Sequence, residues 1–61
     1  MDARRYDRNA DQLAQIYWHL TRSQHHNNDQ AENLRKNMLT MLEAMLIAND
    51  ELGKMAEKGL I

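Results

Sequence analysis

The fold is decided by residues 29–58, which read DQAENLRKNMLTMLEAMLIANDELGKMAEK. One apolar series advances by alternating steps of three and four residues, the a/d spacing of a heptad seam: Ala31, Leu34, Met38, Met41, Met45, Ala48, Leu52 and Met55. A shorter stripe lies about a quarter to a third of a turn away on the same helix: Leu39, Leu42 and Leu46. A helix with two apolar stripes needs two packing partners.

The rest of the chain offers one such partner. Between about residues 3 and 24, apolar side chains again recur at steps of three and four, as in an amphipathic helix: Ala3, Tyr6, Ala10, Leu13, Tyr17 and Leu20. Asp2 is one candidate N-cap for this helix. Asn9 followed by Gln12 forms a competing capping box, which would leave residues 1–8 as a flexible arm. The register of Tyr6 favours the early start.

Polar, turn-forming residues separate the two helical stretches. The loop spans about residues 25–29, and Asp29 is the expected N-cap of a helix from about 30 to 58, with Glu32 completing a capping box. We expect Gly59 to end this helix, and Gly53 inside it costs about 1 kcal/mol relative to alanine. A short loop forces two helices into an antiparallel hairpin, so the sequence predicts an all-α fold with one domain over residues 1–61.

The wide apolar surface predicts self-association. The heptad seam is assigned to the first helix and the leucine stripe to a second subunit. The second helix, at about 44 Å, is longer than the first, at about 33 Å, and should overhang it around Leu52, Met55 and Leu60. With no cysteine for a disulfide, a chain of 61 residues gains most from a second copy. We expect a homodimer, most simply a four-helix bundle, with an interface made of Met38, Leu39, Met41, Leu42, Met45 and Leu46.

The sequence offers little to an enzyme. Ser23 is the only serine, cysteine is absent, and the two glycines form no phosphate-binding loop. His19, His25 and His26 lack the i,i+4 spacing of a helical metal pair. The methionines could bind Cu(I), but their heptad spacing favours packing. We therefore expect a non-enzymatic protein with no cofactor and no metal.

Charge and hydropathy bear on where the chain works. The net charge is −1, the first residues (MDARRYDR) lack the apolar core of a secretory signal, and the apolar segment 38–48 is far shorter than a membrane span of about 20 residues. These features predict a cytoplasmic protein that does not associate with membranes.

Two functions fit these features. The first is to bind and modulate another protein as an adaptor, inhibitor or anti-activator, the type of small regulator that phages and plasmids encode. Tryptophan is a preferred contact residue, and the candidate partner contacts are Trp18, Ile47, Leu52 and Met55. The alternative is an RNA- or DNA-binding dimer using Arg4, Arg5 and Arg8, although interleaved aspartates cancel most of that charge. Only nucleic-acid binding should weaken steeply with salt.

Overall fold

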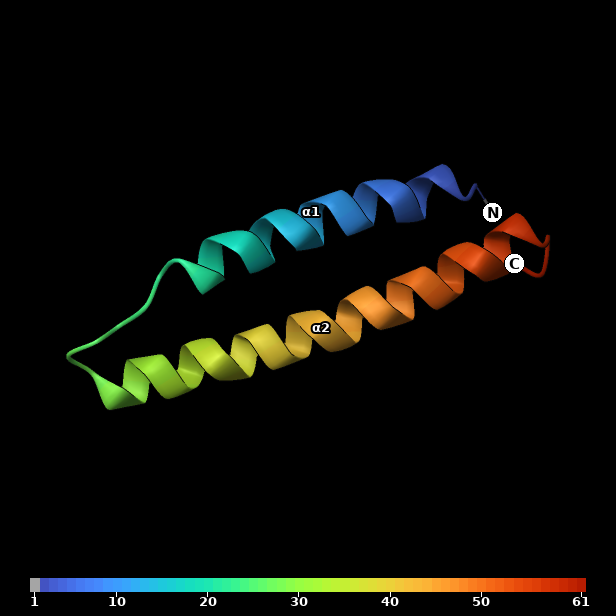
Figure 1. Cartoon of the computed structure of the whole chain (residues 1–61). Helices are drawn as coiled ribbons and strands as arrows, with labels where there is room; N and C mark the ends of the chain where they lie inside the picture. The colour runs from blue at the N-terminus through green and yellow to red at the C-terminus, as the bar shows by residue number, and fades with distance from the viewer. Residues whose placement is uncertain (1) are drawn as a thin grey trace.

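The computed structural model describes residues 2–61 and contains two α-helices, α1 (Arg4–Thr21) and α2 (Asp29–Glu57). The helices lie antiparallel and side by side, and an irregular loop over residues 22–28 joins them (Figure 1). Both chain ends lie at the end of the hairpin opposite this loop. The predicted all-α helical hairpin is confirmed. Neither helix in the described range is long and apolar enough to cross a membrane.

A side-chain oxygen accepts a backbone N–H near the start of each helix, but at α1 the N-cap is Ala3 and not Asp2, the predicted candidate. Asp2 Oδ1 accepts a hydrogen bond from the Arg4 backbone N–H at 2.9 Å, and α1 continues unbroken through Asn9, so residues 4–8 are helical rather than a flexible arm. At α2 the N-cap is Asn28, whose side chain accepts from the backbone N–H three residues on at 3.0 Å. The predicted cap at Asp29 is therefore wrong by one residue. Asp29 lies in the first turn, where a carboxylate still favours the helix dipole.

The end of α2 follows the sequence-based expectation. Gly59 has a φ of 75°, which an L side chain rarely adopts. Its N–H donates to Ala56 O at 3.1 Å, and the Leu60 N–H donates to Met55 O at 2.9 Å. These two bonds form a Schellman motif and satisfy carbonyls that the helix leaves open. The predicted stop at Gly59 is confirmed.

The leucine stripe, and not the methionine series, packs against α1. Leu42 is 7% exposed within the single chain, whereas Met41 beside it is 67% exposed. Buried or half-buried residues extend the stripe at heptad spacing in both directions: Glu32, Arg35, Leu39, Leu42, Leu46, Asn49, Gly53 and Ala56. The assignment of Leu39, Leu42 and Leu46 to a subunit interface is therefore wrong. These three residues form the seam inside the hairpin.

Two polar residues within this seam explain why this side of α2, and not the methionine series, faces α1. Arg35 is 8% exposed and donates from Nη1 to the backbone carbonyl of Leu20 at 2.9 Å. Asn49 is equally buried and donates from Nδ2 to the carbonyl of Tyr6 at 2.9 Å. An unpaired buried polar group costs about 1–3 kcal/mol, so seam positions with polar side chains require such partners. Backbone carbonyls of α1 supply them at both ends of the leucine stripe.

The α1 helix covers α2 as far as its C-terminal end. At Gly53 an added Cβ would lie only 3.2 Å from Tyr6 Cβ, and Ala56 is buried one turn further on. The difference in helix length is taken up at the other end, where residues 22–28 run beside the first turns of α2 (Figure 1). The C-terminal overhang is therefore absent, which corrects the expectation for Leu52, Met55 and Leu60.

The hairpin has very little interior. Its extents are 49 × 15 × 10 Å, and no side chain in the described range is completely buried. Three apolar residues of residues 2–61 count as buried, Tyr6, Leu42 and Ala56. Two packed helices alone thus shield few side chains fully from water, and most large apolar residues of α2 remain in contact with solvent.

Candidate interaction surface

The methionine series of α2 forms an exposed apolar surface. Every one of its members immediately precedes a seam residue, so it lies about 100° around the helix from the seam. We call this surface the methionine face, which consists of Ala31, Leu34, Met38, Met41, Met45, Ala48, Leu52 and Met55. Its six larger side chains are all exposed. Three residues predicted for the dimer interface (Met38, Met41 and Met45) and two predicted partner contacts (Leu52 and Met55) belong to it.

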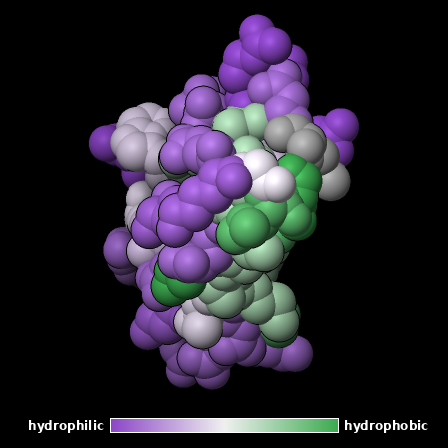
Figure 2. Space-filling model, turned by 90° about the vertical axis from the view of Figure 1, so that its right-hand side faces the viewer, coloured by the Kyte–Doolittle hydropathy of each residue, from purple (hydrophilic) through white to green (hydrophobic). Residues whose placement is uncertain are grey.

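The methionine face continues to the edge of α1 across a shallow groove. Leu13 and Ile16 of α1 line this groove together with Met45 and Leu52 of α2. Two further α1 residues in the lining are polar, Asn9 and Gln12. The view along the hairpin from the end with the chain termini shows apolar surface gathered on one side of the molecule, between polar regions (Figure 2). The face is therefore apolar along α2 and mixed along its α1 edge, where two amides lie among apolar side chains.

Sequence reasoning missed two large apolar residues here, one on the methionine face and one at its α1 edge. Leu34 belongs to the same heptad series but was not among the proposed contact residues, and it is exposed. Ile16 lies at the edge of the α1 stripe and is likewise exposed, beside Met45 in the groove. The heptad register identifies Leu34 directly. Only the packing of the two helices brings Ile16 to the same surface.

The other two candidate contacts lie outside the methionine face. Ile47 is 67% exposed and lies two residues after Met45, which turns it about 200° around α2. Trp18 is 51% exposed, and the Arg22 guanidinium stacks over its ring at 3.9 Å from the centroid. The His19 ring meets Trp18 edge-on with centroids 5.0 Å apart. Trp18, His19 and Arg22 form an aromatic and basic cluster at the end of α1.

The N-terminal arginines do not form a basic patch. Arg4 pairs with Asp2, with Nε 3.2 Å from Oδ2. The hydrogen bond from the Arg4 backbone N–H, and after it this side-chain contact, lower the pKa of the Asp2 carboxyl. Asp2 and Asp7 line one shallow depression together with Arg4 and Arg8. Acidic and basic groups thus alternate on this surface. A phosphate backbone would meet both charges here, whereas nucleic-acid binding surfaces concentrate the positive one.

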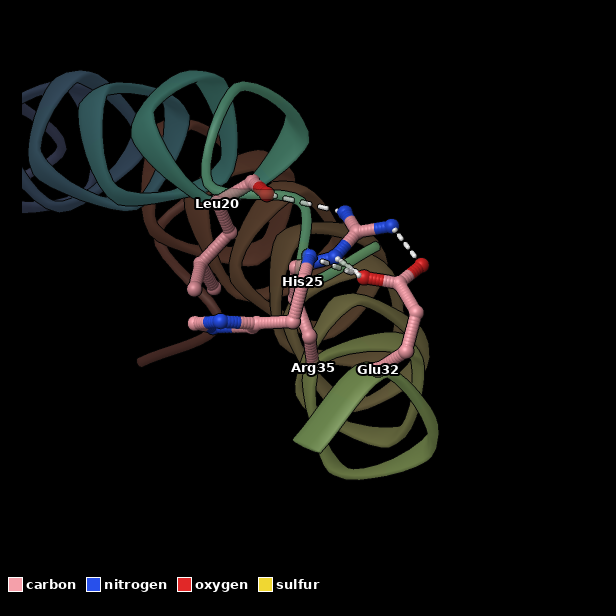
Figure 3. Close-up of polar contacts among 4 residues, drawn as sticks. All are labelled: Leu20, His25, Glu32 and Arg35. Atoms are coloured by element: carbon pink, nitrogen blue, oxygen red, sulfur yellow. Dashed lines mark hydrogen bonds and ion pairs between the residues drawn. The ribbon is translucent and has the colours of Figure 1, made fainter. Parts of the chain in front are cut away.

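A compact group of charges closes the loop end of the hairpin (Figure 3). Glu32 accepts from Arg35 Nε at 2.7 Å and from the backbone N–H of His25 at 3.0 Å. Arg35 also donates to Leu20 O at the C-terminal end of α1, where a cation complements the helix dipole. These two bonds to Glu32, the one from Arg35 above all, lower the pKa of its carboxyl to about 2. The group ties loop, α1 and α2 together and is structural.

Histidines and carboxylates do not gather into a metal site in the described part of the chain. No group of three or more histidine, cysteine or carboxylate side chains in residues 2–61 could hold a metal ion. His25 contributes its backbone N–H to Glu32, and Tyr17 donates its hydroxyl to Glu43 Oε1 at 2.8 Å. Comparisons with known protein families, curated proteins and solved structures found no match. The chemistry of the surface is therefore the only guide to function.

Proposed function

We propose that the protein is a non-enzymatic regulator that forms a homodimer through its methionine face, giving a four-helix bundle. The exposed surface area carries this proposal. The chain exposes 4929 Å², whereas an average folded monomer of 7.2 kDa exposes about 4,100 Å². The excess of roughly 800 Å² equals the area that each partner buries in a standard protein interface.

The pattern of the methionine face favours a helical partner. Its members recur at heptad spacing over eight positions, and such spacing keeps a straight seam against another helix. Methionine is unbranched and adaptable, so it fits well against a second apolar helix surface. A copy of the same chain offers an identical face, and an isologous dimer covers both faces at once.

A pair of equally exposed residues provides a matched test of the dimer. Met41 and Ile47 are each 67% exposed, but only Met41 lies on the methionine face. We expect Met41→Glu to shift the protein from dimer to monomer, because the change buries two charges at the interface. Ile47→Glu should leave the molar mass unchanged. Light scattering after gel filtration measures both, and equal behaviour of the two variants would contradict this interface.

The dimer would act by occluding a surface on another protein. We propose that Trp18 contacts this target, since Trp and Arg dominate binding energy at many interfaces and Arg22 is stacked on the Trp18 ring. Ile47 adds an apolar contact from α2. Both residues are outside the methionine face and so remain accessible in the proposed dimer.

The target proposal requires a comparison of variants. A target captured by the dimer should be purified and its affinity measured against unaltered protein, Trp18→Ala and Thr40→Ala. We expect Trp18→Ala to weaken binding at least tenfold with the dimer mass unchanged, and Thr40→Ala to bind normally. Capture of nucleic acid alone, lost with rising salt and with Arg4→Ala, would contradict the proposal and support the alternative function.

A further inference from the structure

We infer that α2 pairs with α2 of a second copy, antiparallel and in one register, with the two-fold axis at the level of residue 43. This inference rests on the homodimer proposed above. It names the partner segment that covers the methionine face. Three features lead to it: the amide groups at the α1 edge of the groove, the order of large and small residues on the face, and the flanking charges.

The amide groups at the α1 edge of the groove favour α2 of the partner as the helix that meets the methionine face. Two stacked hairpins can place α2 over α2 of the partner or over α1 of the partner. The α1 residues beside the groove include two amides, Asn9 and Gln12, next to the apolar Leu13 and Ile16. The Asn9 amide is already bonded to Asn49 Oδ1 at 3.3 Å, but Gln12 is exposed, and placing α1 over the methionine face would bury its amide against thioethers. Pairing α2 with α2 joins the two apolar faces directly.

The register follows from coverage of the face. With the axis at residue 43, every member of the face meets an apolar residue. Leu34 lies opposite Leu52 of the partner subunit, and Met41 lies opposite Met45 of the partner subunit. A shift by one heptad in either direction leaves two members at one end of each face without a facing residue. The centred register is therefore the one that covers all eight positions.

The order of large and small residues favours the antiparallel direction. In the centred register, Met38 lies opposite Ala48 of the partner subunit, so a large side chain fills the space beside a small one. A parallel pair would instead place Ala48 against Ala48 of the partner subunit and leave a gap. Neighbouring antiparallel helices also have opposed dipoles, which attract, whereas parallel dipoles repel.

The residues that flank the methionine face are compatible with the same arrangement. Ala44 lies next to the two-fold axis in both copies, and its small, exposed side chain lets the helices approach closely. Glu51 would lie near Asn37 of the partner subunit, so no two carboxylates face each other along this edge. The centred antiparallel register thus combines apolar coverage, complementary volumes and an edge without like charges.

Distances between spin labels test the pairing directly. The chain has no cysteine, so Asn33→Cys and Lys58→Cys each introduce one labelling site at an exposed position outside the face. At about 1.5 Å per residue, the axis at residue 43 separates the two copies of site 33 by about 30 Å along the helix, and those of site 58 by about 45 Å. Pulsed dipolar spectroscopy measures both distances.

Each other outcome has a distinct meaning. Shifted registers give about 20 and 56 Å, or about 41 and 35 Å, for the two sites, and either pair would overturn the inferred register. Short, equal separations at both sites indicate parallel helices and overturn the inference while leaving the dimer intact. No dipolar coupling at either site would overturn the dimer itself. Dilution with unlabelled chain should reduce the coupling, which confirms that it arises between subunits.

Discussion

Replacing Gly53 by leucine tests which face of α2 lies against α1. At an exposed helical site this change would raise the free energy of unfolding by about 0.5–1 kcal/mol, because leucine is the better helix former. Gly53, however, belongs to the seam. A Cβ at this position lies 3.2 Å from Tyr6 Cβ and 3.8 Å from Tyr6 Cγ.

The contact distance sets the magnitude and sign of the effect. Carbon atoms pack best at about 3.5–4.0 Å, so the first carbon alone requires a shift of a few tenths of an ångström. The remaining three carbons of leucine must push α1 away from α2. Overpacking of this kind costs about 1–3 kcal/mol, which exceeds the gain in helix propensity. We expect the free energy of unfolding to fall by about 1–2 kcal/mol per chain.

Urea denaturation followed by far-ultraviolet circular dichroism, at one fixed chain concentration, measures this change. Thr40→Leu is the control, since Thr40 is exposed on the same helix and the change gains helix propensity without a clash. A rise in stability for Gly53→Leu equal to or above that of Thr40→Leu would refute the close approach of the helices and the orientation of α2.

Three further predictions concern the seam, the Glu32 ion pair and the methionine face. In urea denaturation, Leu42→Ala should lower the free energy of unfolding by about 2–3 kcal/mol per chain, whereas Ile47→Ala should change it by less than about 0.5 kcal/mol. Similar losses for the two variants would contradict the burial of Leu42 in the seam. The pKa of Glu32 is about 2 in the folded chain against 4.5 ordinarily, so its contribution to stability is present above about pH 4.5 and is lost as pH falls toward 2. Thermal unfolding of Glu32→Gln should therefore depend less on pH over this range than that of the unaltered chain or of Glu57→Gln, and parallel profiles would count against the ion pair. Peroxide oxidation of the methionine face to sulfoxides should weaken the dimer at least tenfold, because each buried sulfoxide costs about 1–3 kcal/mol. Sedimentation measures the affinity of the dimer. Unchanged affinity between fully oxidised chains would argue against this face.

The spacing of apolar residues and the position of turn-forming residues were sufficient to predict most of the backbone. The absence of proline and the two heptad-spaced stretches predicted two helices, and Gly59 marked the end of the second. The end of α1 was placed three residues too late. Thr21 and Ser23 donate their hydroxyls to the carbonyls of Trp18 and His19, at 2.6 and 2.7 Å, and so satisfy the last turn of a shorter helix.

The orientation of α2 could not be read from apolar residues alone. The methionine series has eight apolar members, so it resembles an internal seam more closely than a stripe of three leucines does. The leucine stripe continues through Arg35 and Asn49, whose partners are backbone carbonyls of α1. The sequence does not show which carbonyls will accept these hydrogen bonds, because that depends on how the helices pack. Half of the proposed interface, Leu39, Leu42 and Leu46, therefore belongs inside the hairpin.

The central proposal is that a second copy covers the methionine face. Sedimentation equilibrium of the unaltered chain at micromolar concentration tests it most directly, together with circular dichroism of the same samples. We expect a helical species with twice the chain mass of 7.2 kDa, dissociating reversibly on dilution as mass action requires. A fully helical, cooperatively folded species of 7.2 kDa at these concentrations would contradict the proposal.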